Sequence, residues 1–153
     1  GGFYLPNPPR DGRVFNTPTG KANFITNSLE SLHVDDGQFV MMTIRSHDQY
    51  NTTIYGNDDR YRGISGGRRM VMMNKSDIEA NGWHEFQKVS ITSHFNGSEI
   101  CSEGWFIIEY DIPPSNVATY FPESNVLIPL DSVADGSNTP TSKSVRVTIS
   151  PIS

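Results

Sequence analysis

Residues 43–64, TIRSHDQYNTTIYGNDDRYRGI, come directly after the apolar run FVMM at positions 39–42. The apolar run predicts a buried strand, and the polar stretch after it predicts a long loop rich in hydrogen-bond donors. A core strand that leads into such a loop suits a polar-ligand site, because the strand fixes the first residues and the loop supplies reach. Arg45 comes where the strand should end, so its guanidinium is held in one place and suits a phosphate or a carboxylate.

The same stretch also fits an ordinary surface loop, in which the arginines would pair with their acidic neighbours Asp48, Asp58 and Asp59. The adjacent Asp58 and Asp59 are expected to be solvated loop charges. The net charge of −5 and the pI of about 5.2 argue against nucleic acid as a partner. Five of the 12 Lys and Arg residues nevertheless lie within positions 45–69, against three acidic residues. A locally positive site on an acidic body indicates one anionic ligand held by point contacts.

Apolar or alternating runs after the loop predict further strands. They lie at positions 69–73, 86–93, 104–110, 126–128 and 145–149. Asn96-Gly97 predicts a tight hairpin turn. Ser76 and Glu79 have capping-box spacing and Gly82 can end a helix, so a short helix is expected there. One helical turn is expected at 115–118. The pattern predicts a mainly β fold, a closed or nearly closed barrel with short helices in its connections.

The N-terminal part predicts an extended, proline-containing linker over residues 1–12, followed by short strands at 13–15 and 22–26. We therefore expect a lead-in segment over residues 1–30 and one barrel domain over residues 31–153. The chain does not begin with Met, which indicates a piece of a longer protein. No apolar run approaches about 18 residues, so no transmembrane helix is expected, and no signal-peptide pattern is present.

Few groups in the chain suit catalysis or metal binding. The single Cys101 excludes an internal disulfide, and without a nearby His it predicts a buried structural thiol and not a nucleophile. The four His residues have neither helical pairing nor a carboxylate at metal-ligand spacing, so no protein-bound metal is expected. No catalytic residue is assigned, because no nucleophile–base pair is legible. Cysteine usage favours an intracellular, cytoplasmic protein.

Five segments keep one order along the chain: residues 15–24 (FNTPTGKANF), 43–45 (TIR) with its polar loop, 71–77 (VMMNKSD), 120–127 (YFPESNVL) and 139–143 (TPTSK). In that order they resemble the C-terminal molybdopterin-guanine-dinucleotide-binding domain of molybdenum- or tungsten-dependent oxidoreductases, a group that includes the formate dehydrogenases. The similarity covers nearly the whole chain and is greatest for formate dehydrogenase alpha-subunit-like proteins. One departure is Phe86-Gln87, at a turn where many relatives carry Gly-Asp.

This resemblance implies a double-psi β-barrel with short connecting helices, which binds molybdopterin guanine dinucleotide with molybdenum or tungsten in the full-length enzyme. The cofactor's pyrophosphate, guanine and pterin require cations, amides and hydroxyls. The residues implied at the cofactor are Arg45, Ser46, His47, Gln49, Tyr50, Asn51, Thr52, Tyr120, Asn125 and Lys143. Arg45 would bind phosphate or pterin oxygens. Structural alternatives stay open, because Tyr120 also fits a core position and Asn125 a turn.

The resemblance also implies that the domain is not catalytic in isolation. In the family, the protein ligand of the metal and most of the substrate pocket belong to other parts of the polypeptide. The remaining domains of the parent oxidoreductase would then be the partners, with neither nucleic acid nor a membrane involved. An alternative is a double-psi barrel that binds a protein partner or a substrate without the cofactor. Such a surface should show exposed apolar anchors. A self-contained small enzyme is disfavoured.

Overall fold

The computed structural model describes residues 1–29, 31–51 and 54–152. Two compact units make up the chain, Gly1–Ser31 and Leu32–Ser153. Among the described residues, no helix has both the length and the apolar character needed to cross a membrane.

A short helix, α1 (Pro8–Gly12), forms in the first unit. The Asn7 side chain caps the helix by accepting a hydrogen bond from the Arg10 N–H at 3.1 Å. Prolines occupy the first two positions of the helix, where a backbone N–H has no partner within the helix. The extended linker predicted for residues 1–12 is therefore wrong at this helix. The strands predicted at 13–15 and 22–26 are also wrong, since the described residues of this unit contain no strand with which they could pair.

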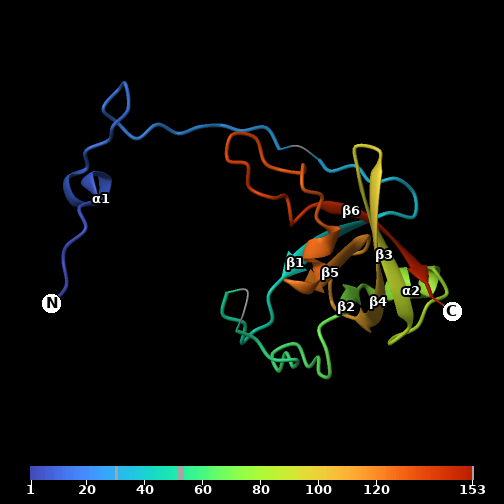
Figure 1. Cartoon of the computed structure of the whole chain (residues 1–153). Coiled ribbons are helices and arrows are strands. Elements are labelled where there is room, and N and C mark those ends of the chain that lie inside the picture. Colours follow the sequence, from blue (N-terminus) through green and yellow to red (C-terminus); the bar gives the residue numbers. More distant parts are fainter. Residues whose placement is uncertain (30, 52–53, 153) are drawn as a thin grey trace. The chain divides into compact units, whose positions relative to one another are not determined.

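Six strands of the second unit form a closed barrel in the order β1–β5–β2–β4–β3–β6 (Figure 1). They are β1 (Phe39–Ile44), β2 (Met70–Met73), β3 (Lys88–Phe95), β4 (Ser98–Glu109), β5 (Asn116–Tyr120) and β6 (Val145–Pro151). β1 pairs with β5 and β2 pairs with β4 in parallel, and the other four pairs are antiparallel. Together with the short α2 (Lys75–Ala80) and the 3-10 helix η1 (Glu123–Leu127), this barrel confirms the mainly β prediction.

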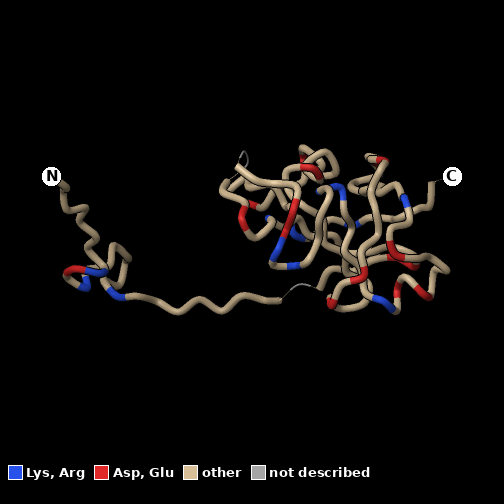
Figure 2. The backbone as a smooth tube through the Cα atoms, turned by 90° about the horizontal axis from the view of Figure 1, so that it is seen from below, with Lys and Arg blue, Asp and Glu red and all other residues tan. Residues whose placement is uncertain are grey.

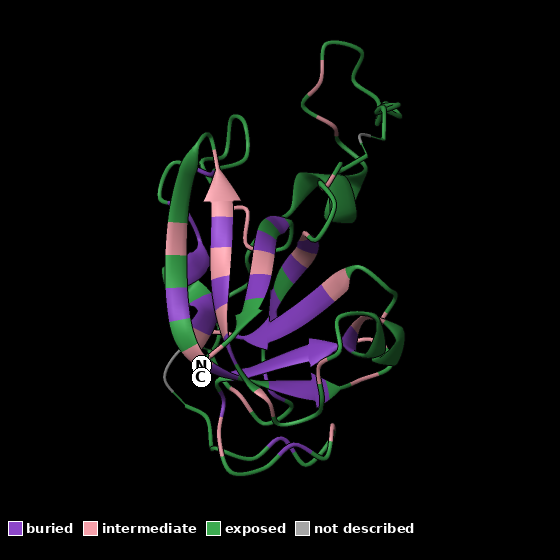
Figure 3. Cartoon of the chain, turned by 90° about the vertical axis from the view of Figure 1, so that its right-hand side faces the viewer, coloured by how far each residue is buried: buried purple, intermediate pink, exposed green. Residues whose placement is uncertain are grey.

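Buried and less buried residues alternate along several strands (Figure 3), and the buried apolar residues form two clusters. The first receives residues from all six strands and so fills the barrel. The second lies on the other face of β2, β4 and β5 and consists of Ile64, Met70, Met72, Ile108, Ala118 and Tyr120. Val71 and Met73 of β2 face the first cluster while Met70 and Met72 face the second, so β2 is covered on both sides. Ile64 comes from the loop between β1 and β2, which therefore covers this outer face.

The predicted turns and caps are mostly confirmed, with one change of residue. Asn96 and Gly97 have φ values of 48° and 78°, as a tight hairpin turn requires. Helix α2 is present, but its N-cap is Asn74 and not Ser76, because the Asn74 side chain accepts the Ser76 N–H at 2.8 Å. Gly82 follows the helix with φ 67°, the left-handed conformation expected of a helix stop.

Two predicted elements of the second unit are also wrong. The strand expected at 126–128 lies in and directly after η1, where Ser124 and Leu127 are buried and Val126 is 52% exposed. That spacing is helical and not alternating. Where a helical turn was expected at 115–118, β5 begins at Asn116 instead. The backbone of β5 pairs with β1 on one side and with β2 on the other.

Cys101 is exposed, so the prediction of a buried thiol is wrong. It lies in β4 opposite Thr92 of β3. Successive side chains of a strand point to opposite faces of the sheet. Ser102 is buried, so its neighbour Cys101 points outward. Cysteine is among the residue types most often buried. That tendency does not show which face of a strand a given cysteine occupies.

Candidate functional site

A loop of residues 45–69 leaves β1 and returns to β2, and a short antiparallel bridge between Asp59 and Ile64 shapes it. The Asp59 N–H donates to the Ile64 carbonyl at 2.7 Å, and the Ile64 N–H donates back at 3.1 Å. Gly63, with φ 70°, supplies the left-handed position of the turn. Figure 2 shows acidic and basic residues next to each other along this loop. The bridge places Ile64 in the outer apolar cluster and buries the neighbouring Asp59.

Asp59 is only 3% exposed, so the prediction of a solvated charge is wrong for it, while Asp58 is exposed as predicted. One carboxylate oxygen, Oδ1, accepts the backbone N–H groups of Tyr61 and Arg62 at 3.2 Å each. The other, Oδ2, accepts Arg62 Nη1 at 2.6 Å and the Tyr120 hydroxyl at 2.8 Å. Both oxygens are therefore satisfied within the protein, as a buried carboxylate requires.

These contacts shift three pKa values. Burial alone would raise the pKa of Asp59, but hydrogen bonds from Arg62 and Tyr120 hold it below its ordinary value. Burial would lower the pKa of Arg62, and the Asp59 carboxylate outweighs that effect and raises it. The pKa of Tyr120 is raised by burial and by its bond to Asp59. At neutral pH the cluster is therefore a carboxylate, a guanidinium and a neutral phenol.

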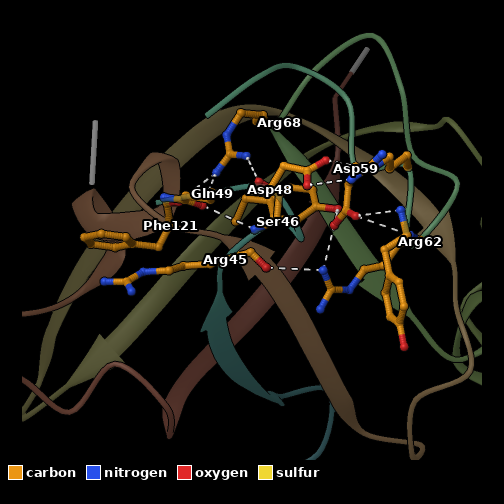
Figure 4. Close-up of polar contacts among 11 residues, drawn as sticks. Arg45, Ser46, Asp48, Gln49, Asp59, Arg62, Arg68 and Phe121 are labelled. Atoms are coloured by element: carbon orange, nitrogen blue, oxygen red, sulfur yellow. Dashed lines mark hydrogen bonds and ion pairs between the residues drawn. The ribbon is translucent and has the colours of Figure 1, made fainter. Parts of the chain in front are cut away.

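A buried arginine, Arg68, ties the loop to the segment after β5 (Figure 4). Its N–H groups donate to Ser46 Oγ at 2.7 Å, Gln49 Oε1 at 2.9 Å, the Phe121 carbonyl at 2.8 Å and Glu123 Oε1 at 2.9 Å. The guanidinium also lies over the rings of Tyr55 and Tyr120, at 4.1 Å and 4.9 Å. Arg68 is thus a structural clamp for the loop.

Beside this clamp lies a cavity of about 500 Å³ at the ends of β1 and β5. It is lined by Thr43, Ile44, Arg45, Arg62, Phe121, Ser142 and Lys143. The three basic residues come from the end of β1, the loop, and the segment before β6. Ser142 and Lys143 reach the wall because the Ser142 carbonyl accepts the Thr43 N–H at 2.9 Å.

The three basic side chains are held differently. Lys143 Nζ donates to the Thr43 carbonyl, and Arg62 Nη1 donates to the Arg45 carbonyl at 3.2 Å as well as to Asp59. No described residue forms a hydrogen bond or ion pair with the Arg45 guanidinium, which extends away from Arg62 in Figure 4. The cavity therefore has two tethered cations and one open fork, an arrangement that attracts an anion.

Among the residues predicted at the site, Arg45 and Lys143 line this cavity together. Ser46 and Gln49 do not. Ser46 is buried and accepts from Arg68. The side-chain oxygen of Gln49, Oε1, accepts from the Ser46 N–H and from Arg68, while its Nε2 donates to the backbone carbonyls of Asn51 and Phe121 at 3.0 Å and 2.9 Å. These two polar side chains shape the loop from within.

The other predicted residues are spread over several environments. Tyr120 is 1% exposed and its hydroxyl is bonded to Asp59. His47 is exposed and stacks on Tyr61, with ring centroids 4.8 Å apart. Tyr50 is 74% exposed, and Asn125 is exposed within η1. Asn51 is an exposed loop residue with φ 58°. Thr52 lies outside the described residues. Cofactor contact stays a prediction for all of them.

The sequence interpretation missed Arg62 and Phe121 at the cavity and Asp59 and Arg68 beneath it. The spacing of Asp59 and Arg62, three residues apart, was a weak signal of an ion pair. Nothing in the sequence distinguishes Arg68 from the adjacent Arg69. Among the described residues, no group of three or more His, Cys, Asp or Glu side chains could hold a metal ion.

The amino-acid sequence matches a known protein family. The model of the molydopterin dinucleotide binding domain matches residues 39–146. An uncharacterized oxidoreductase of Mycobacterium tuberculosis (strain H37Rv) is 48% identical over 98% of this chain and 20% of its own length. Protein YdeP of Escherichia coli (strain K12) is 39% identical over 99% of this chain and 21% of its own length. The chain spans about a fifth of the curated relatives that it matches.

A solved structure supports the fold alone. Acetylene hydratase from Pelobacter acetylenicus matches with a TM-score of 0.53 and 5% sequence identity, over 72% of this chain and 18% of that one. Together with the closed six-stranded barrel, this likeness confirms the predicted double-psi β-barrel with short connecting helices. Since the family model covers most of the chain, including the whole barrel up to the start of β6, the chain belongs to the molydopterin dinucleotide binding domain family.

Proposed function

We propose that this chain binds molybdopterin guanine dinucleotide and that the cofactor's phosphates occupy the cavity of Arg45, Arg62 and Lys143. The observation that carries this proposal is the meeting of three basic side chains from separate segments at one cavity. The open Arg45 guanidinium supplies the main contact. Family membership supports the same class of ligand.

The groups at the cavity fit a diphosphate in size and chemistry. A volume of about 500 Å³ lies within the range of about 300–1,000 Å³ that is usual for ligand pockets. Arg45 offers a planar fork that matches two phosphate oxygens. Lys143 carries three N–H groups, of which one goes to the Thr43 carbonyl and the others can serve a ligand. Ser142 adds a hydroxyl at the wall.

The role that follows is binding and orientation of the cofactor. When bound, the cofactor supplies the redox chemistry through its molybdenum or tungsten, and this domain holds one side of it. We infer a parent oxidoreductase of the formate dehydrogenase type with this chain as its C-terminal domain. The motif order described above supports that inference, and so does the word oxidoreductase in the names of the mycobacterial relatives. Residues 31–153 would be the binding domain and residues 1–30 its lead-in. The cytoplasmic location stays a prediction.

The test compares Arg45→Ala, Arg45→Lys and Arg60→Ala in the full-length parent enzyme. Arg60 is a matched control, because it lies in the same loop, is paired with Asp48 at 2.9 Å and does not line the cavity. Its side chain is 76% exposed. Arg45→Ala should weaken cofactor binding by about 1.5–3 kcal/mol, the usual contribution of a hydrogen bond to a charged group. Arg45→Lys should restore part of the loss, since a point charge does not replace a fork.

In Arg45→Ala, cofactor occupancy and activity should fall together, while Arg60→Ala keeps both. Wild-type cofactor content in Arg45→Ala would contradict the proposal at its centre. The experiment measures metal and pterin content per polypeptide alongside activity, so that loss of occupancy is separated from loss of turnover.

One observation favours a second role as an interaction surface. On the outer part of the loop, Tyr50, Ile54 and Tyr61 are 74%, 62% and 74% exposed, as expected of apolar anchors. We propose that they contact another domain of the parent oxidoreductase. Tyr61→Ser and Ile54→Ser should then increase protease cleavage between domains of the full-length enzyme without changing the barrel. Unchanged cleavage would remove this candidate.

A further inference from the structure

Directly beneath the cavity lies a buried chain of contacts from Tyr120 through Asp59 to Arg62. The Tyr120 hydroxyl donates to Asp59 Oδ2 at 2.8 Å, and the same oxygen accepts Arg62 Nη1 at 2.6 Å. Tyr120 is 1% exposed and Asp59 is 3% exposed, whereas the Arg62 side chain is 21% exposed and lines the cavity. The buried end of the chain thus leads to a cation at the wall.

These contacts fix how Arg62 meets the cavity. Nη1 donates both to Asp59 and to the Arg45 carbonyl at 3.2 Å, so one corner of the planar guanidinium has two fixed acceptors. Because the five N–H groups of arginine lie in one rigid plane, fixing one corner orients the rest. The rest of the fork borders the same cavity as Arg45, whose own guanidinium has no partner among the described residues.

We propose that Asp59 is a positioning residue which holds Arg62 ready to bind a phosphate oxygen, with the Tyr120 hydroxyl fixing Asp59 in turn. This inference rests on the proposed function of the cavity and identifies its second phosphate contact. The two arginines then act differently: Arg45 closes on the anion from solvent, while Arg62 is set in place before the anion arrives. Preset donors bind without the entropic cost of ordering a long side chain.

A sign test separates positioning from simple neutralisation. Asp59 carries a negative charge close to an anion site. If its only effect were electrostatic, Asp59→Asn would add one unit of positive charge and tighten anion binding. If Asp59 positions Arg62, the same substitution should weaken binding, because an amide does not hold the guanidinium at Oδ2 in the same way. The two roles therefore predict changes of opposite direction.

The experiment measures binding of inorganic pyrophosphate and of GDP to this 153-residue chain by calorimetry. It compares the wild type with Asp59→Asn, Arg62→Ala and the double variant. We expect Asp59→Asn to weaken binding about 5- to 50-fold, and to have no further effect in the Arg62→Ala background. Equal or tighter binding by Asp59→Asn would overturn the inference. Full weakening by Asp59→Asn in the absence of Arg62 would also overturn it.

A second variant covers the case in which Asp59→Asn does not fold, as checked by circular dichroism. Tyr120→Phe keeps the ring and every charge but removes the hydroxyl that holds Asp59. It should weaken pyrophosphate binding about 2- to 10-fold and only when Arg62 is present. Wild-type affinity in a folded Tyr120→Phe variant would overturn the role of the hydroxyl. If the wild type itself binds neither probe, the cavity assignment fails, and the inference that rests on it fails with it.

Discussion

Different forces hold the barrel interior and the loop of residues 45–69, in which most described residues are exposed. The interior is a cluster of apolar side chains supplied by all six strands. The loop contributes Ile64 to the outer cluster and is otherwise held by hydrogen bonds and by two partly buried ion pairs, Asp59 with Arg62 and Arg68 with Glu123. These polar contacts are directional and share partners, so they depend on one another.

This difference sets how each region responds to change. Apolar contacts are numerous and non-directional, so an interior tolerates modest swaps and loses stability in proportion to the volume removed. A buried ion pair gives little net stability, yet removal of one partner is costly because the other charge stays buried. The loop should thus keep one well-defined conformation while its ion pairs are intact and lose that conformation when one partner is removed. Such a loop suits a site that must hold its hydrogen-bond donors in fixed positions.

The largest expected effect comes from breaking the interior. Trp105 is fully buried, and its indole N–H donates to Ser102 Oγ at 3.1 Å. Trp105→Ala should lower the free energy of unfolding by about 3–5 kcal/mol, measured by urea denaturation. Phe106→Ala is the matched control, since Phe106 is the next residue and is 37% exposed. Equal losses in the two variants would show that the interior does not dominate stability.

The next effect comes from breaking the loop. Arg68→Met should cost about 2–4 kcal/mol, because it leaves the Glu123 carboxylate, whose side chain is only 18% exposed, without its cation and removes the bonds to Ser46 Oγ and Gln49 Oε1. Protease should cut the loop faster while the circular dichroism of the barrel persists. Arg69→Met is the control, because the adjacent Arg69 is exposed and its guanidinium donates to the Glu103 carbonyl and not to a loop residue among those described. Similar behaviour of both variants would contradict the clamp.

A smaller effect should appear with pH. The pKa of Asp59 is below its ordinary value of 3.8, so its contribution to stability is present above that pH and is lost as the pH falls through the lower, folded value. Tyr120, whose pKa is raised above 10.0, contributes below pH 10 and loses that contribution as the pH rises further. Denaturation midpoints across pH should show both declines. Tyr120→Phe should remove the alkaline one, and its persistence would contradict the assignment.

The same contrast explains what the sequence could predict. Alternation in the runs around Val89 and Val147, and the Asn96-Gly97 turn, follow from local spacing, and they predicted most of the barrel. The end of the predicted strand pointed to Arg45, and the resemblance added Lys143; both line the cavity.

Burial of the loop charges could not be predicted, because in two adjacent identical pairs only one member is buried. Asp59 is buried beside exposed Asp58, and Arg68 is buried beside exposed Arg69. Which member turns inward depends on the bridge between Asp59 and Ile64 and on an acceptor 55 residues away, Glu123, and no local pattern contains that information.

The smallest expected change in stability separates a binding arginine from a structural one. Arg45 and Arg68 have the same chemistry and both belong to the loop, but only Arg68 has buried acceptors. The Arg45 guanidinium forms no hydrogen bond with any described residue, and Arg45 is exposed. The free energy of unfolding of Arg45→Ala should therefore stay within about 0.5 kcal/mol of the wild type. Because the substitution also removes one charge from a positive cavity, repulsion with Arg62 and Lys143 should fall slightly, and added salt should reduce any difference. Urea denaturation of this chain at low and high salt measures both. A loss near that of Arg68→Met would mean that Arg45 holds the loop together and is not free to bind an anion.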